Sequence, residues 1–236
     1  MKNIQLTHIL TMLSLLMFMG CSPSTKSEFN VLDYGAKSDG QTLTTAPIQS
    51  AIDDCSKAGG GVVLLPKGDY LVGTLNLHSN IEFRFETGAR LIATTDLTQY
   101  QRHNTELAGV FYTEKADNVS ITGKGTIFGQ GMKFMYPDSA KVISGSVLDY
   151  VRQGKNLRKV NSGIGDGPLY PKDRFHQMIV FSDCTNVELS DFTCIDSPYW
   201  CFVIVHCDRI TVRNLKIDNN LVIPNSDGLD IISCSN

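Results

Sequence analysis

Two segments decide the fold: they read CTNVELSDFTCI at residues 184–195 and CDRITVRNLKID at residues 207–218, and the second begins 23 residues after the first. Both alternate apolar with polar residues, which is the period of two typical of a β-strand. The aligned apolar pairs are Val187 with Ile210, Leu189 with Val212, Phe192 with Leu215, and Cys194 with Ile217. A unit this short cannot bury its apolar side alone and must stack on copies of itself. The repeat therefore predicts an all-β parallel β-helix, with Val187 and Ile210 as stacked inward neighbours. Leucine-rich repeats have a similar period, but their leucine consensus is absent.

Other features of the chain follow the same repeat. An asparagine precedes the strand at Asn80, Asn118 and Asn186, a position suited to a turn or a left-handed conformation. Cys184 and Cys207 occupy one repeat position, and Cys234 begins a further coil at the same position. We expect these three thiols to stack inward as small buried side chains rather than form disulfides.

Residues 44–58 have helical spacing instead. Thr44 or Thr45 can cap the helix, and Pro47 suits its first turn. Its apolar positions are Ile48, Ala51, Ile52 and Cys55, and three glycines at 59–61 end it. Because an open β-helix end invites strand addition, we expect a short helix covering the N-terminal end. The neighbouring Asp53 and Asp54 point apart on a helix and are expected to be solvated.

The first 28 residues are different in kind. Residues 1–20 combine a positive start with an apolar run too short to span a bilayer, which indicates a secretory signal. The signal ends in Gly20-Cys21, which resembles a bacterial lipoprotein signal whose cleavage leaves Cys21 as the lipidated first residue. An ordinary signal with an accidental cysteine is the alternative. We expect residues 21–28 to be a polar tether, residues 29–236 to be the β-helix domain, and the protein to be exported and membrane-anchored, in the periplasm or at the outer membrane.

Composition excludes several function classes. The chain has 236 residues, 42% of them hydrophobic and 19% charged, which is ordinary for a folded domain. Its net charge of −3 becomes −4 without residues 1–20, so nucleic acid is not an expected partner. Neither a C-x-x-C pair nor zinc-like Cys and His spacing occurs, so no metal site is predicted.

Residues 131–175 interrupt the repeat. They carry eight basic residues against four acidic ones. We interpret the segment as a basic flap beside an anionic substrate, with Lys155, Arg158 and Lys159 as substrate-binding residues; a solvated loop is the alternative. Residues 139–153 could form a helix within it.

Five motifs carry a family resemblance. They are FNVLDYGA at 29–36, GGGVV at 59–63, NVSITGKGTI at 118–127, SPYW at 197–200 and NSDGLD at 225–230. Together they resemble the amino-terminal portion of the polygalacturonases, glycoside hydrolase family 28, and the resemblance covers residues 29–236. The glycine-rich entry is shared with other β-helix enzymes, whereas NSDGLD after SPYW is fairly specific.

The resemblance implies a right-handed, pectin-lyase-like parallel β-helix that hydrolyses α-1,4-galacturonan with inversion and needs no cofactor. It implies that Asp227 is the first of three catalytic aspartates and that Asn225 and Asp230 belong to the substrate cleft. Asp230 is expected to bond nearby backbone rather than react. The other family aspartates, a histidine and an Arg-x-Lys pair do not follow Asp230, so the chain is expected to be truncated and poorly active. The expected partner is a pectic polysaccharide, bound by a monomer.

Chemistry supports the assignment of Asp227. Inverting hydrolysis needs a proton donor and a water-holding carboxylate about 6.5–9.5 Å apart. Neighbouring coils lie roughly 4.8 Å apart, so carboxylates on adjacent coils can stand on opposite sides of one sugar. Asp227 would hold the water. Two alternatives remain: a β-helix polysaccharide lyase, for which the sequence shows no acidic calcium cluster, and a non-catalytic carbohydrate-binding β-helix lipoprotein.

Overall fold

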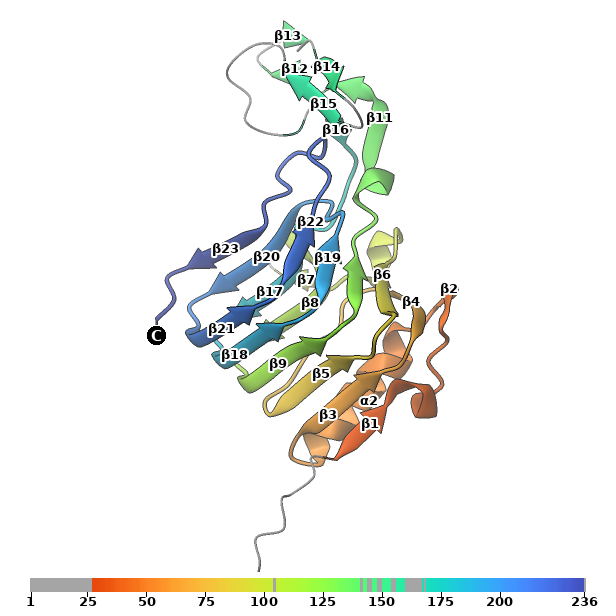
Figure 1. Ribbon diagram of the computed structural model, residues 1–236, viewed down its shortest axis with the longest axis vertical. Helices are drawn as coiled ribbons and strands as arrows, with labels where there is room; N and C mark the ends of the chain where they lie inside the picture. The colour runs from red at the N-terminus through yellow and green to blue at the C-terminus, as the bar shows by residue number, and fades with distance from the viewer. Residues whose placement is uncertain are drawn as a thin grey trace, which may run out of the picture.

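Three parallel sheets run along the molecule, and each receives one strand from almost every turn of the chain (Figure 1). The computed structural model describes residues 27–235 except 104, 141, 144–145, 148–149, 154–155, 160–166 and 168, and only the backbone of strand residues 140–159. The first sheet contains β1 (Glu28–Asn30), β3 (Gly61–Leu65), β5 (Ile81–Phe85), β9 (Asp117–Gly123), β18 (Thr185–Ser190) and β21 (Asp208–Arg213). The second contains β2 (Asp39–Leu43), β4 (Gly68–Val72), β6 (Ala89–Ala93), β10 (Thr126–Phe128), β19 (Thr193–Ile195) and β22 (Lys216–Asp218).

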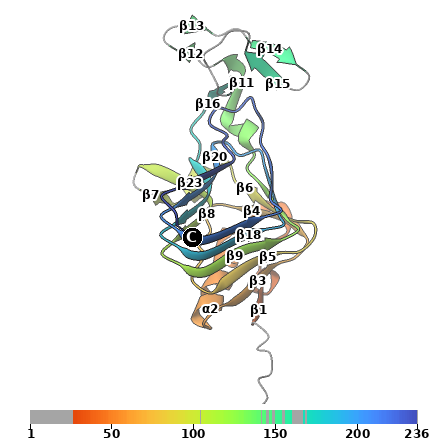
Figure 2. The same ribbon diagram turned by 60° about the vertical axis from the view of Figure 1, so that its left-hand side comes forward.

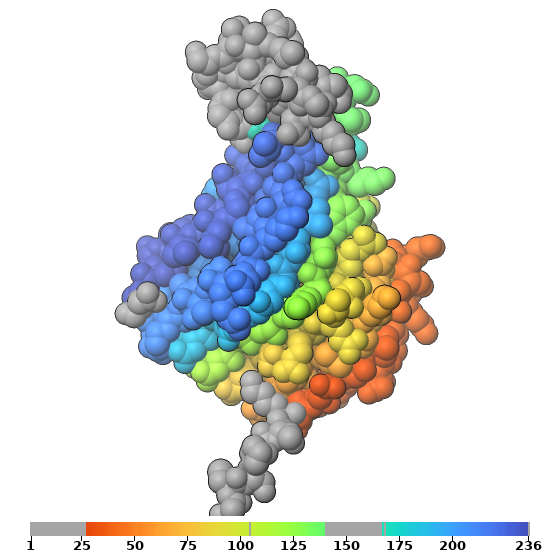
Figure 3. Space-filling model, in the orientation of Figure 1, coloured from red at the N-terminus to blue at the C-terminus, as the bar shows by residue number. Residues whose placement is uncertain are grey.

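The third sheet completes each coil. It contains β8 (Glu106–Glu114), β17 (Gln177–Ser182), β20 (Trp200–Val205) and β23 (Leu229–Ile232), and the short β7 (Arg102–His103) pairs antiparallel with β8. Successive coils form parallel bands across the surface, from the N-terminal to the C-terminal colours (Figure 3). The fold is a right-handed parallel β-helix, as predicted.

The strand register agrees with the 23-residue repeat. Val187 pairs with Ile210 on one side and with Val119 on the other. Val187 is buried, and the partly buried Ile210 packs against the core. The predicted stacking of these two inward positions is confirmed.

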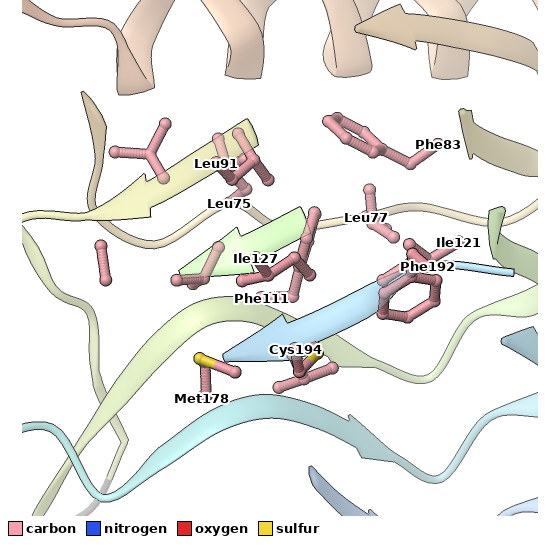
Figure 4. Close-up of a cluster of buried hydrophobic side chains, with 14 of the residues drawn as sticks. Leu75, Leu77, Phe83, Leu91, Phe111, Ile121, Ile127, Met178, Phe192 and Cys194 are labelled. Carbon is pink, nitrogen blue, oxygen red and sulfur yellow. The ribbon is translucent and has the colours of Figure 1, made fainter. Parts of the chain in front are cut away.

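Aromatic and aliphatic side chains fill the space between the three sheets (Figure 4). Phe83 lies edge-on to Phe111, with ring centroids 5.2 Å apart, and Phe192 stacks on Phe85 at 6.0 Å. The Cys184 and Cys207 thiols are buried and free, and the backbone N–H of Cys184 lies 3.4 Å from Cys207 Sγ. The inward thiol stack is confirmed, and Cys234 continues it, packed against the core.

An asparagine ladder joins the coils where they enter the first sheet. Asn80, Asn118 and Asn186 are left-handed, with φ of 63°, 54° and 54°. Asn118 Nδ2 donates to Asn80 Oδ1 at 3.0 Å, and Asn186 Nδ2 donates to Asn118 Oδ1 at 2.8 Å. Arg209 Nε donates to Asn186 Oδ1 at 2.6 Å, in the position that asparagine holds in the coils before it. The predicted turn positions are therefore tied together by side chains.

The predicted capping helix is α2 (Thr45–Lys57), which lies across β1 and β3 at the N-terminal end (Figure 1). Its buried residues are those predicted: Ile48, Ala51, Ile52 and Cys55. Thr44 is the N-cap residue, but its hydroxyl accepts from Lys37 N, and that of Thr45 accepts from Gly73 N. The threonines therefore tie the helix to neighbouring loops instead of capping it.

The segment that interrupts the repeat leaves the coil stack as antiparallel ribbons (Figure 2). They pair β11 (Met135–Ala140) with β16 (Leu169–Pro171), β12 (Val142–Ile143) with β13 (Ser146–Val147), and β14 (Tyr150–Gln153) with β15 (Asn156–Lys159). The helix expected over residues 139–153 is wrong, because the described residues of this stretch are strands. No helix in the described part of the chain is long and apolar enough to span a membrane.

Candidate active site

Asp227 lies in the loop between β22 and β23, where its backbone is held and its side chain is exposed. The Asp227 carbonyl accepts a hydrogen bond from Cys201 N at 2.9 Å, so the loop joins the third sheet before β23 begins. Asn219 Nδ2 donates to the carbonyl of the preceding Ser226 at 2.9 Å. These bonds fix the backbone on both sides of the carboxylate, which faces solvent on an ordered turn.

Asn225 is held by an arginine from the segment before β17, two coils earlier in the chain. Its backbone is left-handed, with φ of 58°, and its Oδ1 accepts from Arg174 Nη2 at 3.3 Å. Arg174 Nη1 also donates to the carbonyl of Pro224 at 2.8 Å and to that of Pro198. The guanidinium carbon lies 4.3 Å from the centroid of the Tyr199 ring. Arg174 therefore joins the loop that carries Asp227 to the turn before β20.

Asp230 lies on β23, in register with Val203 on the outer side of the third sheet. Burial raises the pKa of its carboxyl, and the nearby negative charge of Asp227 raises this pKa further. Its buried Oδ2 has no hydrogen-bond partner among the described residues, so the expected bond to nearby backbone is not made by this oxygen. Asp230 is thus a half-buried carboxyl group whose protonated form is favoured by burial and by the nearby Asp227 charge.

A groove of about 590 Å³ opens beside Arg174, the arginine that bonds Pro224 and Asn225 of this loop. Its polar lining residues are Thr98, Arg102, Thr105, Lys172, Asp173, Arg174 and His176, and Tyr199 contributes an aromatic ring. Three cationic side chains face one carboxylate there, so the groove suits an anionic ligand. Because Arg174 both lines the groove and bonds Asn225, the groove and the Asp227 loop form one site.

A larger hollow of about 790 Å³ lies on the other side of the same loop, over the ends of β10, β19 and β22. It is lined by acidic and amide side chains, including Asp196, Asp218 and Asn219. Burial raises the pKa of Asp196, whose Oδ1 has no hydrogen-bond partner among the described residues. None of the described residues that line this hollow is a cation, so we place the candidate site in the smaller, basic groove.

Some predicted site residues lie outside the described part of the chain. Lys155 and Cys21 are among them, and Arg158 and Lys159 are described only as backbone of β15. Among the described residues, no group of three or more His, Cys, Asp or Glu side chains could hold a metal ion.

The sequence analysis missed the groove residues contributed by other segments. Arg102 and His176 were assigned no role, Tyr199 was noted only as part of the SPYW motif, and Arg174 was counted only as one charge of the basic flap. The one usable signal was that Arg174 stands at the C-terminal end of that flap, just before the coil repeat resumes at β17.

The sequence matches a family model described as glycosyl hydrolases family 28 over residues 55–236. An exopolygalacturonase from Zea mays is 34% identical over 211 residues, covering 85% of this chain and 42% of the relative. A probable rhamnogalacturonase E from Aspergillus oryzae is 28% identical over 211 residues, covering 87% of this chain and 38% of the relative. The chain therefore spans less than half the length of these curated relatives.

A solved structure with the same fold is a hyperthermoactive exopolygalacturonase from Thermotoga maritima. It matches with a TM-score of 0.64 at 24% identity, covering 88% of this chain and 50% of that one. At this level of identity the likeness concerns the fold.

Proposed function

Because this chain belongs to the glycosyl hydrolases of family 28, we propose that Asp227 is a catalytic carboxylate of an enzyme that hydrolyses galacturonan. The substrate is an α-1,4-linked pectic chain, and the reaction inverts the anomeric configuration. One observation carries the proposal: Asp227 is an exposed carboxylate on a turn held by Cys201 and Asn219, next to a basic groove.

The groove supports the choice of an anionic polysaccharide. Guanidinium and ammonium groups bind carboxylates through short, charge-assisted hydrogen bonds. Arg102, Lys172 and the Tyr199 ring all line the groove. Arg174 lies against that ring and also bonds Asn225, two residues before Asp227. A neutral polysaccharide would offer these cations no carboxylate to bind.

The roles of the two carboxyl groups follow from their environments. Asp227 is exposed and suits a group that holds and activates water as a carboxylate. Asp230, with its raised pKa, stays beside it as a substrate-binding group. Its carboxyl oxygens can form hydrogen bonds with a sugar hydroxyl.

The test is reducing-end release from polygalacturonate by the longest protein that the gene encodes. Asp227→Asn is expected to lower kcat by at least about 100-fold, the range of general acid–base contributions, with little change in KM. Asp218→Asn is the matched control, because this exposed aspartate faces the other side of the loop. Near-full activity of Asp227→Asn would refute the assignment. Rhamnogalacturonan serves as the alternative substrate, and the anomer first formed, followed by NMR, tests inversion.

The basic flap is the second part of the proposal. Neutralising Lys155, Arg158 and Lys159 to glutamine is expected to raise KM for polygalacturonate and to weaken its dependence on salt. Replacing Lys57 and Lys67 instead is the control, because these exposed lysines lie near the N-terminal end. An unchanged KM and salt dependence would indicate a solvated loop.

We also propose that Cys21 is lipidated and anchors the exported protein. Cys21→Ser is expected to abolish fatty-acid labelling and release the protein from the membrane fraction. Because a single acyl chain binds membranes only marginally, retention requires multiple acylation. Labelling that survives the substitution would refute the anchor.

A further inference from the structure

The ribbon of β11 and β16 presents two tyrosine rings to solvent. Tyr136 and Tyr170 are cross-strand partners, and their side chains are 46% and 50% exposed. The ring centroids lie 5.9 Å apart, and the ring planes are tilted by 37°. The two rings therefore form a continuous aromatic surface, which we call the tyrosine platform.

The opposite side of the ribbon is anchored in the core. Met135 and Leu169, the neighbours of the two tyrosines along each strand, are buried. Leu169 N donates to the carbonyl of Val222 at 3.0 Å, in the loop that leads to Asp227. The platform thus stands on a strand that is bonded directly to the catalytic loop, so its position relative to the groove is set by the fold.

Lys172 links the platform to the groove. Its Nζ lies 5.4 Å from the centroid of the Tyr136 ring and donates to the carbonyl of Lys133 at 3.1 Å. The same lysine lines the basic groove with Arg174 and Tyr199. An anionic chain that leaves the groove past Lys172 meets the tyrosine rings next.

We propose that the tyrosine platform is an auxiliary binding site for pyranose rings of a polyuronate chain, outside the catalytic groove. A pyranose presents a face of C–H groups that packs on an aromatic ring, and a tyrosine supplies such a ring at low conformational cost. The Lys172 ammonium is placed to pair with a uronate carboxylate at the platform edge. The inference rests on the proposed substrate class but not on Asp227.

A purely structural role for the tyrosines makes different predictions. Cross-strand aromatic pairs stabilise a ribbon by themselves. That role requires no ligand and would affect stability alone. Binding must therefore be measured separately from folding.

The experiment uses native electrophoresis of the full chain through gels that contain increasing polygalacturonate, with neutral galactan as the comparison. The double variant Tyr136→Ala/Tyr170→Ala is expected to bind polygalacturonate about tenfold more weakly, a loss typical of an aromatic contact residue. Tyr136→Phe/Tyr170→Phe keeps the rings and should stay within about twofold of the wild type. Leu43→Ala is the matched control, because Leu43 is a similarly exposed side chain on β2. Circular dichroism checks that every variant is folded.

Unchanged retardation of the double alanine variant would overturn the proposal. So would absence of retardation of the wild type, or equal retardation in galactan, because the platform would then not hold a uronate. If the double variant does not fold, Tyr136→Ala and Tyr170→Ala decide singly, each with an expected loss of about threefold; no loss in either overturns the proposal. Platform-dependent binding by a protein that fails to hydrolyse polygalacturonate would refute the proposed function and leave the platform standing.

Discussion

Replacing Arg174 should loosen the loop that carries Asp227, and the structure sets the size of the effect. The guanidinium bonds the carbonyls of Pro198 and Pro224 and the amide oxygen of Asn225, and it covers Tyr199. A hydrogen bond from a charged donor contributes about 1.5–3 kcal/mol. A partly exposed cation–π contact adds about 0.5–1 kcal/mol. Because Arg174 is only half-buried, water replaces part of what is lost. We expect Arg174→Ala to lower the free energy of unfolding by about 2–3 kcal/mol.

The single tryptophan makes this effect measurable, because Trp200 follows Tyr199, with ring centroids 5.6 Å apart. Urea unfolding is followed by Trp200 fluorescence and by circular dichroism. For an m-value of about 2–3 kcal/mol per M, the fluorescence midpoint of Arg174→Ala should fall by about 1 M. Fluorescence should change before circular dichroism if the loop opens first.

Two further variants sharpen the result. Arg174→Lys keeps the charge but not the planar fork, so it should recover at most about half of the loss. Arg102→Ala is the control. Among the described residues, this exposed groove arginine donates one hydrogen bond, to the Thr105 carbonyl. If Arg174→Ala unfolds at the wild-type midpoint, or if Arg174→Lys is indistinguishable from the wild type, the guanidinium does not hold the loop as described.

Three other predictions concern folding. Asp196→Asn should be more stable than the wild type at pH 7 and equally stable at acid pH. Burial raises the pKa of the Asp196 carboxyl, so the folded state holds the proton more tightly than the unfolded state does. The stability of the wild type therefore falls as the pH rises from about 3.9 through the raised pKa. Parallel pH profiles in urea would contradict this. Asn118→Ala should lower the free energy of unfolding by about 1–3 kcal/mol, because alanine disfavours the left-handed backbone and removes two ladder hydrogen bonds. Asn118→Gly tolerates the left-handed backbone, so its loss in thermal unfolding should be smaller. Equal losses for the two variants would exclude a backbone contribution. Gly123→Ala should lower the free energy of unfolding by about 1–3 kcal/mol more than Gly59→Ala. Both glycines have φ near 90°, so the backbone strain is the same in the two variants. At Gly123, however, a Cβ would lie 2.1 Å from the Phe85 carbonyl oxygen, whereas at Gly59 it would meet no atom within 4 Å. Equal midpoints for the two variants would show that the coils separate freely at this point.

The coil stack could be predicted because its information is local and repeated. Val187 and Ile210 are 23 residues apart in the chain and occupy one position in successive coils, so their spacing alone determined their pairing. The left-handed asparagines were equally accessible, since few residue types tolerate that conformation. The hydrogen bonds between these asparagines could not be predicted, because the sequence spacing between successive ladder positions is unequal. It is 38 residues from Asn80 to Asn118 and 68 residues from Asn118 to Asn186.

The insertion and the groove were beyond the same reasoning. No coil repeat constrains residues 139–153, and a helix was expected although Val142, Ile143 and Val147 are β-branched residues that favour strands. Arg174 holds oxygens that lie 24, 50 and 51 residues away in the chain. Such a role depends on three segments that meet at one edge of the β-helix: the segment before β17, the turn before β20 and the loop before β23. No local sequence pattern indicates this meeting.

The asparagine ladder also bears on how such a chain can change its length over evolution. The strands of each coil pair in register with those of the coils before and after it, and the ladder joins neighbouring coils in the same way. Duplicating a whole coil away from the Arg174 contacts would therefore add a complete rung and keep the pairing of the other strands. Inserting a single residue inside a strand would instead move every following side chain of that strand to the opposite face of the sheet. Viable length variation among descendants of this gene should thus arise as whole rungs or as changes in the loops at the edges, where the 131–175 insertion already lies.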